Sequence, residues 1–203
     1  MIKTVIFDLD GTLLDTLEDL YQAVSHAFTL YGYKSPNKEE VKKALGKGPL
    51  VLMQRLGAKD PELFLEAFAL YYHEHLDVYT RPYPGIMELL DELDKKEIEM
   101  AVLSNKPHEH LVRICDIYFK DRFFAVMGSG AGFPRKPDPT SLLHLMNKIG
   151  RQKNELLYVG DSEVDILTAK KAKCRGLQVS WGFGSLVKDA DFIEKAWDLL
   201  SHL

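Results

Sequence analysis

The chain has 203 residues, of which 46% are hydrophobic and 28% are charged, as is typical of a soluble globular protein with its own core. Its net charge of −4 and pI near 6.0 argue against a surface for nucleic acid or anionic membrane, which needs a basic excess. The longest unbroken apolar run, Ala67–Tyr72, is too short to cross a membrane or direct export. Two cysteines outside any CxxC pair, Cys115 and Cys174, fit reduced thiols, so we expect a cytoplasmic protein.

Short apolar runs alternate with helical patterns along most of the chain. Thr4–Phe7 is β-branched and aromatic, which predicts a strand buried on both faces, and similar runs lie at 99–104, 123–127, 155–160 and 176–180. Helical spacing of apolar residues occurs around 86–93 and 142–149. This alternation predicts an α/β fold, a doubly wound, Rossmann-like parallel sheet whose functional residues lie beyond the carboxyl ends of the strands.

The segment 17–79 interrupts this alternation, because it contains no strand-like run. An apolar helix face extends over Leu17–Tyr31, and a second helix is expected from Pro61, since proline fits a first helical turn. We therefore predict a core domain of residues 1–16 and 80–203 with an inserted α-helical domain at 17–79. The segment Arg81–Gly85 would be the hinge at which the chain returns to the core.

Two aspartates, Asp8 and Asp10, end the first predicted strand and are followed by Gly11. A single aspartate there would most simply cap a turn or a helix. Two close carboxylates, however, repel each other unless a cation or a proton lies between them. A hard cation such as Mg²⁺ takes carboxylate and carbonyl oxygens, and Gly11 allows the backbone to turn a carbonyl towards it. The pattern predicts a Mg²⁺ site.

Polar side chains also follow three later strands: Ser104 and Asn105, then Lys136, then Asp161 and Asp165. Four of them have an ordinary alternative, namely helix N-capping for the serine and asparagine, a solvated charge for the lysine, and a capping box for Asp165. Asp161 is harder to explain in this way, because a glycine brings the backbone close there. Together they combine metal-binding acids, a hydroxyl and an ammonium group. That combination suits a phosphoryl group, whose transfer depends on positioning and charge neutralisation.

In chain order, DLDGT (8–12), Ser104, Lys136 and GDSEVD (160–165) resemble the four motifs of the haloacid dehalogenase superfamily of phosphohydrolases, over essentially the whole chain. The resemblance implies a Mg²⁺-dependent phosphomonoester hydrolase that forms an aspartyl-phosphate, with Asp8 as nucleophile and Asp10 as general acid and then base. It implies Mg²⁺ ligation by Asp8, by the Asp10 carbonyl and by Asp161. Asp165 would support the metal site without ligating the ion, by ordering its water ligands or Lys136.

The resemblance also implies roles for the other motif residues. Ser104 and Lys136 would bind phosphoryl oxygens, with Lys136 restraining the nucleophile as well. Gly11 and Thr12 would shape the phosphate-binding loop, and Asn105 would line the pocket. The end of the match, DSEVDILTAKKA and SWGFGS (180–185), is similar to the phosphoglycolate phosphatase subgroup, which implies a small phosphorylated metabolite such as 2-phosphoglycolate.

In this architecture the inserted helices would choose the substrate. The loop GKGP (46–49) would present backbone amides and Lys47 to a second anionic group of the substrate; the alternative is a plain turn with Lys47 in solvent. Arg55, Arg81 and His26 are weaker candidates. The aromatic residues Tyr71 and Tyr72 are expected in the core of the helical domain.

Three other functions remain open on the sequence. They are a phosphomutase resembling β-phosphoglucomutase, a pyrophosphatase or nucleotidase of the same superfamily, and a receiver-type switch that accepts one phosphoryl group without turnover. Release of many phosphates per chain would favour an enzyme over the switch. The expected partner is a small-molecule phosphate ester, and we expect no binding to nucleic acid or to a membrane. The protein itself is expected to be a monomer or a homodimer.

Overall fold

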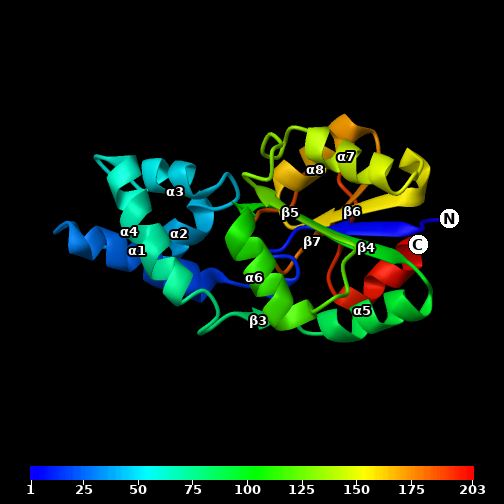
Figure 1. Ribbon diagram of the computed structural model, residues 1–203, viewed down its shortest axis with the longest axis horizontal. Coiled ribbons are helices and arrows are strands. Elements are labelled where there is room, and N and C mark those ends of the chain that lie inside the picture. The colour runs from blue at the N-terminus through cyan, green and yellow to red at the C-terminus, as the bar shows by residue number, and fades with distance from the viewer.

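The computed structural model describes all residues from Met1 to Leu203 and contains a six-stranded sheet in the order β5-β4-β1-β6-β7-β8, with every pair parallel (Figure 1). The strands are β1 (Thr4–Phe7), β4 (Glu99–Pro107), β5 (Ala125–Ser129), β6 (Leu156–Gly160), β7 (Arg175–Val179) and β8 (Phe192–Ile193). Because β1 lies between β4 and β6, the carboxyl ends of these three strands meet at one edge. The predicted doubly wound α/β fold is confirmed.

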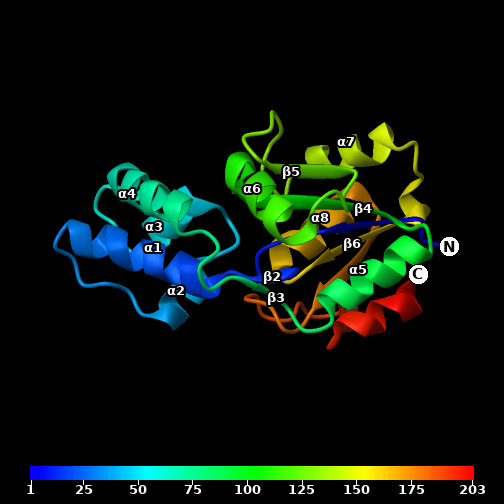
Figure 2. The same ribbon diagram turned by 60° about the horizontal axis from the view of Figure 1, so that its bottom comes forward.

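Helices cover both faces of this sheet (Figures 1 and 2). Along β1, Val5 and Phe7 belong to the hydrophobic cluster on one face and Ile6 to the cluster on the other, as the two-residue period of a strand requires. The first face is covered by α5 (Ile86–Lys95), α6 (His108–Phe119) and the 3₁₀-helix η2 (Ala196–His202), and the second by α7 (Thr140–Lys148) and α8 (Glu163–Ala172). A short 3₁₀-helix, η1 (Lys153–Glu155), precedes β6.

Strand β4 is longer than the predicted run at 99–104. It continues to Pro107, and its pairing with β5 shifts register between Leu103 and Pro107. Helix α6 then begins at His108, so the alternative assignment of Ser104 and Asn105 as helix caps is wrong. The physical reason is that parallel pairing with β5 keeps this segment extended. The extension carries the polar residues past the point where the apolar run ends.

The segment between β1 and the rest of the sheet forms a separate bundle at one end of the molecule, which we call the helical unit (Figures 1 and 2). It comprises α1 (Leu17–Leu30), α2 (Lys38–Ala44), α3 (Pro49–Arg55) and α4 (Pro61–Glu74). The predicted start of α4 is confirmed, since Pro61 takes its first turn and the Asp60 side chain accepts a hydrogen bond from the Leu63 amide. The two short helices α2 and α3 were not predicted.

Two neighbouring chain segments join the helical unit to the sheet. Strand β2 (Leu14–Asp15) pairs antiparallel with β3 (Arg81–Pro82), so the predicted hinge is part of a small ladder. Just beyond it, the buried Asp19 carboxylate of α1 accepts hydrogen bonds from the Tyr79 amide at 3.0 Å, the Thr80 amide at 2.8 Å and the Thr80 hydroxyl at 2.7 Å. The outgoing and returning chains are therefore fixed to each other.

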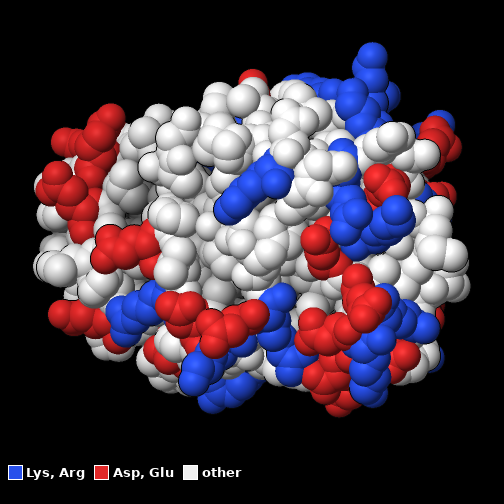
Figure 3. All heavy atoms as spheres, turned by 45° about the vertical axis from the view of Figure 1, so that its right-hand side comes forward, with Lys and Arg blue, Asp and Glu red and all other residues white.

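The charged side chains on the face shown in Figure 3 are intermixed, with Lys and Arg beside Asp and Glu over its lower part and a broad, mostly uncharged area above them. No helix of the structure has both the length and the apolar character that a membrane crossing would need. The two cysteines are free thiols, with Cys115 buried and Cys174 half-buried.

Replacing Asp19 with alanine should lower the free energy of unfolding by about 2–4 kcal/mol, because the Tyr79 and Thr80 donors would be left buried without an acceptor. The matched control is Asp60→Ala, which removes the exposed cap of α4 and should cost about 1 kcal/mol. Urea unfolding measures both. Equal losses for the two variants would contradict the proposed importance of the junction.

Candidate active site

Asp8 stands directly after β1, at the edge where the central strands end. Its Oδ1 accepts a hydrogen bond from the Leu9 amide at 2.8 Å and lies 3.0 Å from Lys136 Nζ. Burial raises the pKa of the Asp8 carboxyl to about 6, against the opposing effect of Lys136; the charges of Asp165 and Asp10 raise it further. The carboxylate thus lies at a buried site where negative charge needs more compensation than one ammonium group supplies.

Lys136 lies behind this carboxylate and is almost completely buried. Its ammonium group donates to Asp165 Oδ1 at 2.7 Å and Tyr158 Oη at 2.9 Å and forms an ion pair with Asp8 Oδ1 at 3.0 Å. Burial alone would lower the pKa of Lys136, but Asp165 and Asp8 outweigh it and hold that pKa well above its ordinary value. Lys136 is therefore a fixed positive charge.

Asn105 holds Lys136 in place from the end of β4. Its Oδ1 accepts from the Lys136 amide at 2.8 Å, and its Nδ2 donates to the Lys136 carbonyl at 3.0 Å. The same Nδ2 also donates to the carbonyl of Gly46 at 3.0 Å, in the loop between α2 and α3. One side chain thus connects the strand end, the lysine loop and the helical unit.

Asp161 follows β6 and faces Asp8. Its Oδ2 accepts from the amides of Phe183 at 2.7 Å and Gly184 at 3.2 Å. Burial, followed by the charges of Asp165 and Asp8, raises the pKa of the Asp161 carboxyl to about 8. Gly11, with φ of +82°, packs directly against this group, since a Cβ at that position would lie 2.4 Å from Asp161 Oδ2. Only glycine fits between the first loop and this acid.

Asp165 completes the acidic cluster but has both of its oxygens occupied. Oδ1 accepts from Lys136, and Oδ2 accepts from the Ser162 amide at 3.1 Å and the Ser162 hydroxyl at 2.6 Å. The capping interaction of Asp165 expected from the sequence is thus present, and its support of a metal site stays a prediction, to which its contact with Lys136 is suited. Carboxylate oxygens of Asp8, Asp161 and Asp165 lie within 4.8 Å of one another, close enough to hold one metal ion.

A divalent cation fits this donor set. Three buried carboxylates surround a single ammonium group, and the pKa values of Asp8 and Asp161 are raised by burial and then by the charges of neighbouring acids. Since the oxygens of Asp165 are engaged elsewhere, Asp8 and Asp161 are the side chains that could ligate a cation directly. A hard, oxygen-seeking ion is the matching class.

Asp10 lies nearer to the helical unit and has a partner that the sequence did not reveal. Its Oδ1 accepts from the Thr16 hydroxyl at 2.7 Å and from Lys106 Nζ at 2.9 Å. The Lys106 ammonium also donates to Tyr72 Oη at 2.7 Å and lies 4.7 Å from the centre of that ring. Burial lowers the pKa of Lys106, but Asp10 and Tyr72 outweigh burial and raise it above its ordinary value.

Lys106 was missed because a lysine in a short SNKP run is most simply a solvated surface charge. Its side chain is only 2% exposed, because β4 continues to Pro107 and carries it under α4. The one available signal was its position, directly after Ser104 and Asn105. Tyr72 is buried, as expected for the core of the helical domain, but its hydroxyl also reaches the site.

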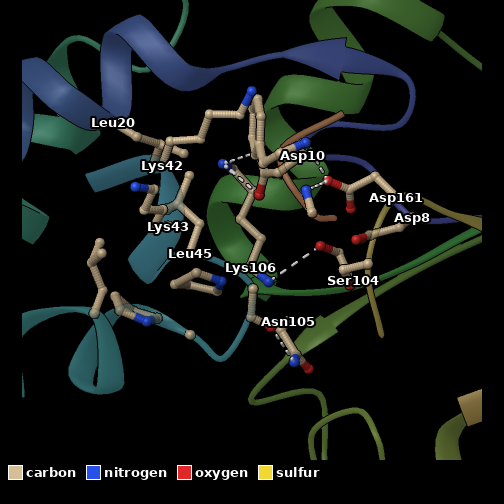
Figure 4. A pocket seen from close by; sticks show the side chains of 18 of the residues that line it. Asp8, Asp10, Leu20, Lys42, Lys43, Leu45, Ser104, Asn105, Lys106 and Asp161 are labelled. Atoms are coloured by element: carbon tan, nitrogen blue, oxygen red, sulfur yellow. Dashed lines mark hydrogen bonds and ion pairs between the residues drawn. The ribbon is translucent and has the colours of Figure 1, made fainter. Parts of the chain in front are cut away.

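A cavity between the sheet edge and the helical unit joins these groups (Figure 4). Figure 4 shows Asp8, Asp161 and Ser104 on one side and Lys42, Lys43 and Leu45 on the other. The remaining lining residues from the helical unit are Leu20, Gly46, Gly48, Pro49, Leu52, Phe68 and Tyr72. From the sheet side Asp10, Asn105, Lys106, Pro107, His110, Ser162 and residues 183–185 also line it.

The structure brings most of the site residues predicted from the sequence to this cavity, but not all of them. Asp8, Asp10, Ser104, Asn105 and Asp161 line it, while Lys136 and Asp165 lie directly behind. Gly11 and Thr12 do not line it. The Thr12 hydroxyl is buried without a hydrogen-bond partner, and the Thr12 carbonyl accepts from Trp181 Nε1 at 3.1 Å, so both residues shape the loop.

The prediction for Lys47 requires a correction. The side chain is exposed and does not line the cavity, because the chain turns at Gly46 and Gly48, both with positive φ, and leaves Lys47 on the outer side. The cations of the helical unit at the cavity are Lys42 and Lys43 instead.

The three weaker candidates are occupied elsewhere. Arg55 donates to the carbonyl of Ala44 at 3.2 Å, Arg81 donates to the carbonyl of Thr80, and His26 stacks on Tyr71. None of them lines the cavity.

Known proteins are similar to this chain in sequence and in fold. The family model described as haloacid dehalogenase-like hydrolase matches residues 5–179, and the chain belongs to this family. The resemblance based on the four motifs is thus confirmed. The match begins within β1 and ends with β7, so it contains every acidic and basic residue of the cluster around Lys136.

Individual relatives are similar over nearly their whole length. A phosphoglycolate phosphatase from Vibrio parahaemolyticus is 36% identical over 198 residues, covering 90% of this chain and 85% of that protein. One from Aquifex aeolicus is 33% identical over 187 residues, covering 91% and 88%. A crystal structure from Lactobacillus delbrueckii subsp. bulgaricus superposes with a TM-score of 0.92 at 29% identity, covering 98% and 97%. The chain is a phosphatase of the haloacid dehalogenase family.

The raised pKa values predict that the metal-free protein loses stability as the pH rises. Asp8, with a pKa of about 6, and Asp161, with a pKa of about 8, bind more protons when folded than when unfolded, where carboxyl pKa values are near 4. The free energy of unfolding in a chelator should therefore fall from about pH 4 to pH 8, by several kcal/mol in order of magnitude. Urea titrations across this range measure it.

The matched control for this pH dependence is Asp161→Asn, which removes the carboxyl group with the larger shift and should flatten the upper half of the profile. A wild-type profile that stays flat or rises between these pH values would contradict the inferred under-compensation of the acidic cluster.

Proposed function

We propose that this protein is a Mg²⁺-dependent phosphomonoester hydrolase that works through an aspartyl-phosphate on Asp8. The observation that carries the proposal is the position of Asp8. Its carboxylate lies at the end of the central strand, lines the cavity, and is held by Lys136 at 3.0 Å. A nucleophilic carboxylate must be oriented and kept ionised, and the buried ammonium contributes to both.

Two steps follow from the positions of Asp8 and Asp10. An Asp8 oxygen attacks phosphorus, the bond from phosphorus to the ester oxygen breaks, and Asp10 gives its proton to that leaving oxygen. Asp10 then takes a proton from water, whose oxygen attacks phosphorus and releases inorganic phosphate and free Asp8. Thr16 and Lys106 hold Asp10 for both transfers.

Other residues would bind rather than react. Ser104 lines the cavity beside Asp8 and would donate to a phosphoryl oxygen, while Lys136 compensates the charge from behind. Mg²⁺ would be held by Asp8, Asp161 and the Asp10 carbonyl, and when bound it neutralises the phosphoryl oxygens. Asp165 would hold Lys136 and the start of α8 in position, and Asn105 would hold the loop of Lys136.

We further propose that residues 17–79 are a cap domain on a core of residues 1–16 and 80–203. The helical unit supplies the wall of the cavity opposite Asp8, and only two chain segments connect it to the sheet. A cap in this position shields the reacting phosphoryl group from solvent and contacts the leaving group.

The proposed substrate is a small phosphate ester whose leaving group carries a second anionic group, such as 2-phosphoglycolate. The names of the relatives from Vibrio parahaemolyticus and Aquifex aeolicus support this choice. So does the presence of Lys42, Lys43 and Lys106 among the cavity residues, away from the acidic cluster.

Asp8→Asn should lower turnover at least about 1,000-fold, because an amide is not a usable nucleophile at phosphorus. The measurement is phosphate released from 2-phosphoglycolate, sugar phosphates and nucleoside monophosphates. Wild-type protein should release many phosphates per chain with Mg²⁺ and almost none with EDTA. Turnover by Asp8→Asn above background would contradict the nucleophile assignment. One phosphoryl group retained per wild-type chain would instead indicate a switch.

Asp10→Asn should separate the two chemical steps. With p-nitrophenyl phosphate the leaving group needs no proton, so a stoichiometric burst of p-nitrophenol should precede a turnover slowed about 10²–10⁴-fold. With an alkyl phosphate no burst should appear, since the amide cannot protonate the leaving oxygen. Asp15→Asn, a change at an exposed aspartate outside the cavity, is the matched control. Wild-type rates with alkyl phosphates in Asp10→Asn would contradict the role.

A further inference from the structure

His110 lines the cavity, and the proposed steps do not use its chemistry. It lies in the first turn of α6 and is 8% exposed. Its Nδ1 is buried without a hydrogen-bond partner. A buried polar atom without a partner costs free energy, so its retention at a cavity needs a reason. A bound ligand that shares hydrogen bonds with the ring supplies one.

The surroundings of His110 define what such a ligand would meet. The Tyr72 ring lies edge-on at 5.4 Å between ring centres, and the same tyrosine contacts Lys106. The Lys106 ammonium donates to both Asp10 oxygens, at 2.9 and 3.3 Å, and to Tyr72 Oη at 2.7 Å, so its three N–H groups are taken. The Tyr72 hydroxyl accepts from Lys106 and keeps its own O–H to donate. Burial, followed by the charge of Lys106, lowers the pKa of His110 to about 4, so the ring is neutral at pH 7.

Three lysines line the cavity, Lys42 and Lys43 from the helical unit and Lys106 from β4. Asp10, which also lines it, is already bonded to Lys106 and Thr16. A ligand group placed beside His110 and Lys106 would therefore meet hydrogen-bond donors and positive charge. Such a site selects a group that only accepts hydrogen bonds, and an ionised carboxylate is the smallest common one.

We propose that His110, together with Lys106 and Tyr72, forms the subsite that binds a carboxylate on the leaving group of the substrate, and that His110 determines specificity for carboxylated esters. This inference rests on the proposed function, because it places the reacting phosphoryl group at Asp8 and the carboxylate at the opposite end. One carboxylate oxygen takes the O–H of Tyr72, next to the charge of Lys106, and the other takes an N–H of the neutral imidazole.

The test compares 2-phosphoglycolate with ethyl phosphate, which keeps the phosphoryl group but lacks the carboxylate. In His110→Phe, KM for 2-phosphoglycolate should rise about 10- to 100-fold with kcat nearly unchanged, as expected for loss of a hydrogen bond to a charged group. KM for ethyl phosphate should stay within about twofold of the wild type. His110→Gln, which keeps an N–H donor, should recover part of the lost affinity.

Two controls separate recognition from folding. His73→Gln changes a neighbouring histidine whose ring lies 5.6 Å from that of His110 but which does not line the cavity, and it should leave both KM values unchanged. Inhibition by inorganic phosphate, which binds only the Asp8 end, should be equal in wild type and His110→Phe. If His110→Phe leaves the ratio of the two KM values unaltered, or raises both equally, the subsite is refuted.

The subsite can also be tested if no ester is turned over and the proposed function fails. Calorimetric titration of 2-phosphoglycolate into Asp8→Asn, in the presence of Mg²⁺, measures binding without chemistry. Weaker binding by Asp8→Asn/His110→Phe than by Asp8→Asn supports the subsite independently of catalysis. Equal binding by the two proteins, or no binding by either, overturns it.

Discussion

The buried ammonium group of Lys136 is the charge on which the rest of the site depends. It reaches Asp8 at 3.0 Å and Asp165 at 2.7 Å, with Asp161 close by, and without it these acids would repel one another in a medium that screens charge poorly. Its position depends in turn on Asn105, and therefore on the extension of β4. Local backbone pairing thus decides the electrostatics of the centre.

A second buried cation repeats this arrangement closer to the helical unit. Lys106 joins Asp10, which follows the first strand, to Tyr72 of α4. The proposed general acid is thereby fixed by contacts from both parts of the molecule. Because Asn105 also bonds to Gly46, two adjacent residues of β4 connect the catalytic edge to the helices that cover it. The position of the helical unit and the geometry of Asp8 and Asp10 are therefore coupled.

The cavity that results is polarised. Its sheet side carries Asp8 and Asp161, whose carboxyl pKa values are raised by burial and then by neighbouring acids, and also Lys106 and the unpartnered ring of His110. Its helical side carries Lys42 and Lys43. A ligand that suits this cavity brings a divalent cation and a phosphoryl group to the acids and an anionic acceptor to the cations. In the proposed function, the lysines of the helical unit therefore contribute to the choice of substrate.

The sequence by itself determined the sheet, the helical insertion and the motif residues Asp8, Ser104, Lys136 and Asp161, because strand ends, glycines and acids are local signals. Lys106 could not be predicted, since its burial depends on a strand extension and a helix that are distant in sequence. The same holds for the orientation of the loop at 46–49, which turns its lysine outward, and for the orphaned His110 nitrogen. Only tertiary packing decides which charges are buried together, because burial and pairing arise between segments.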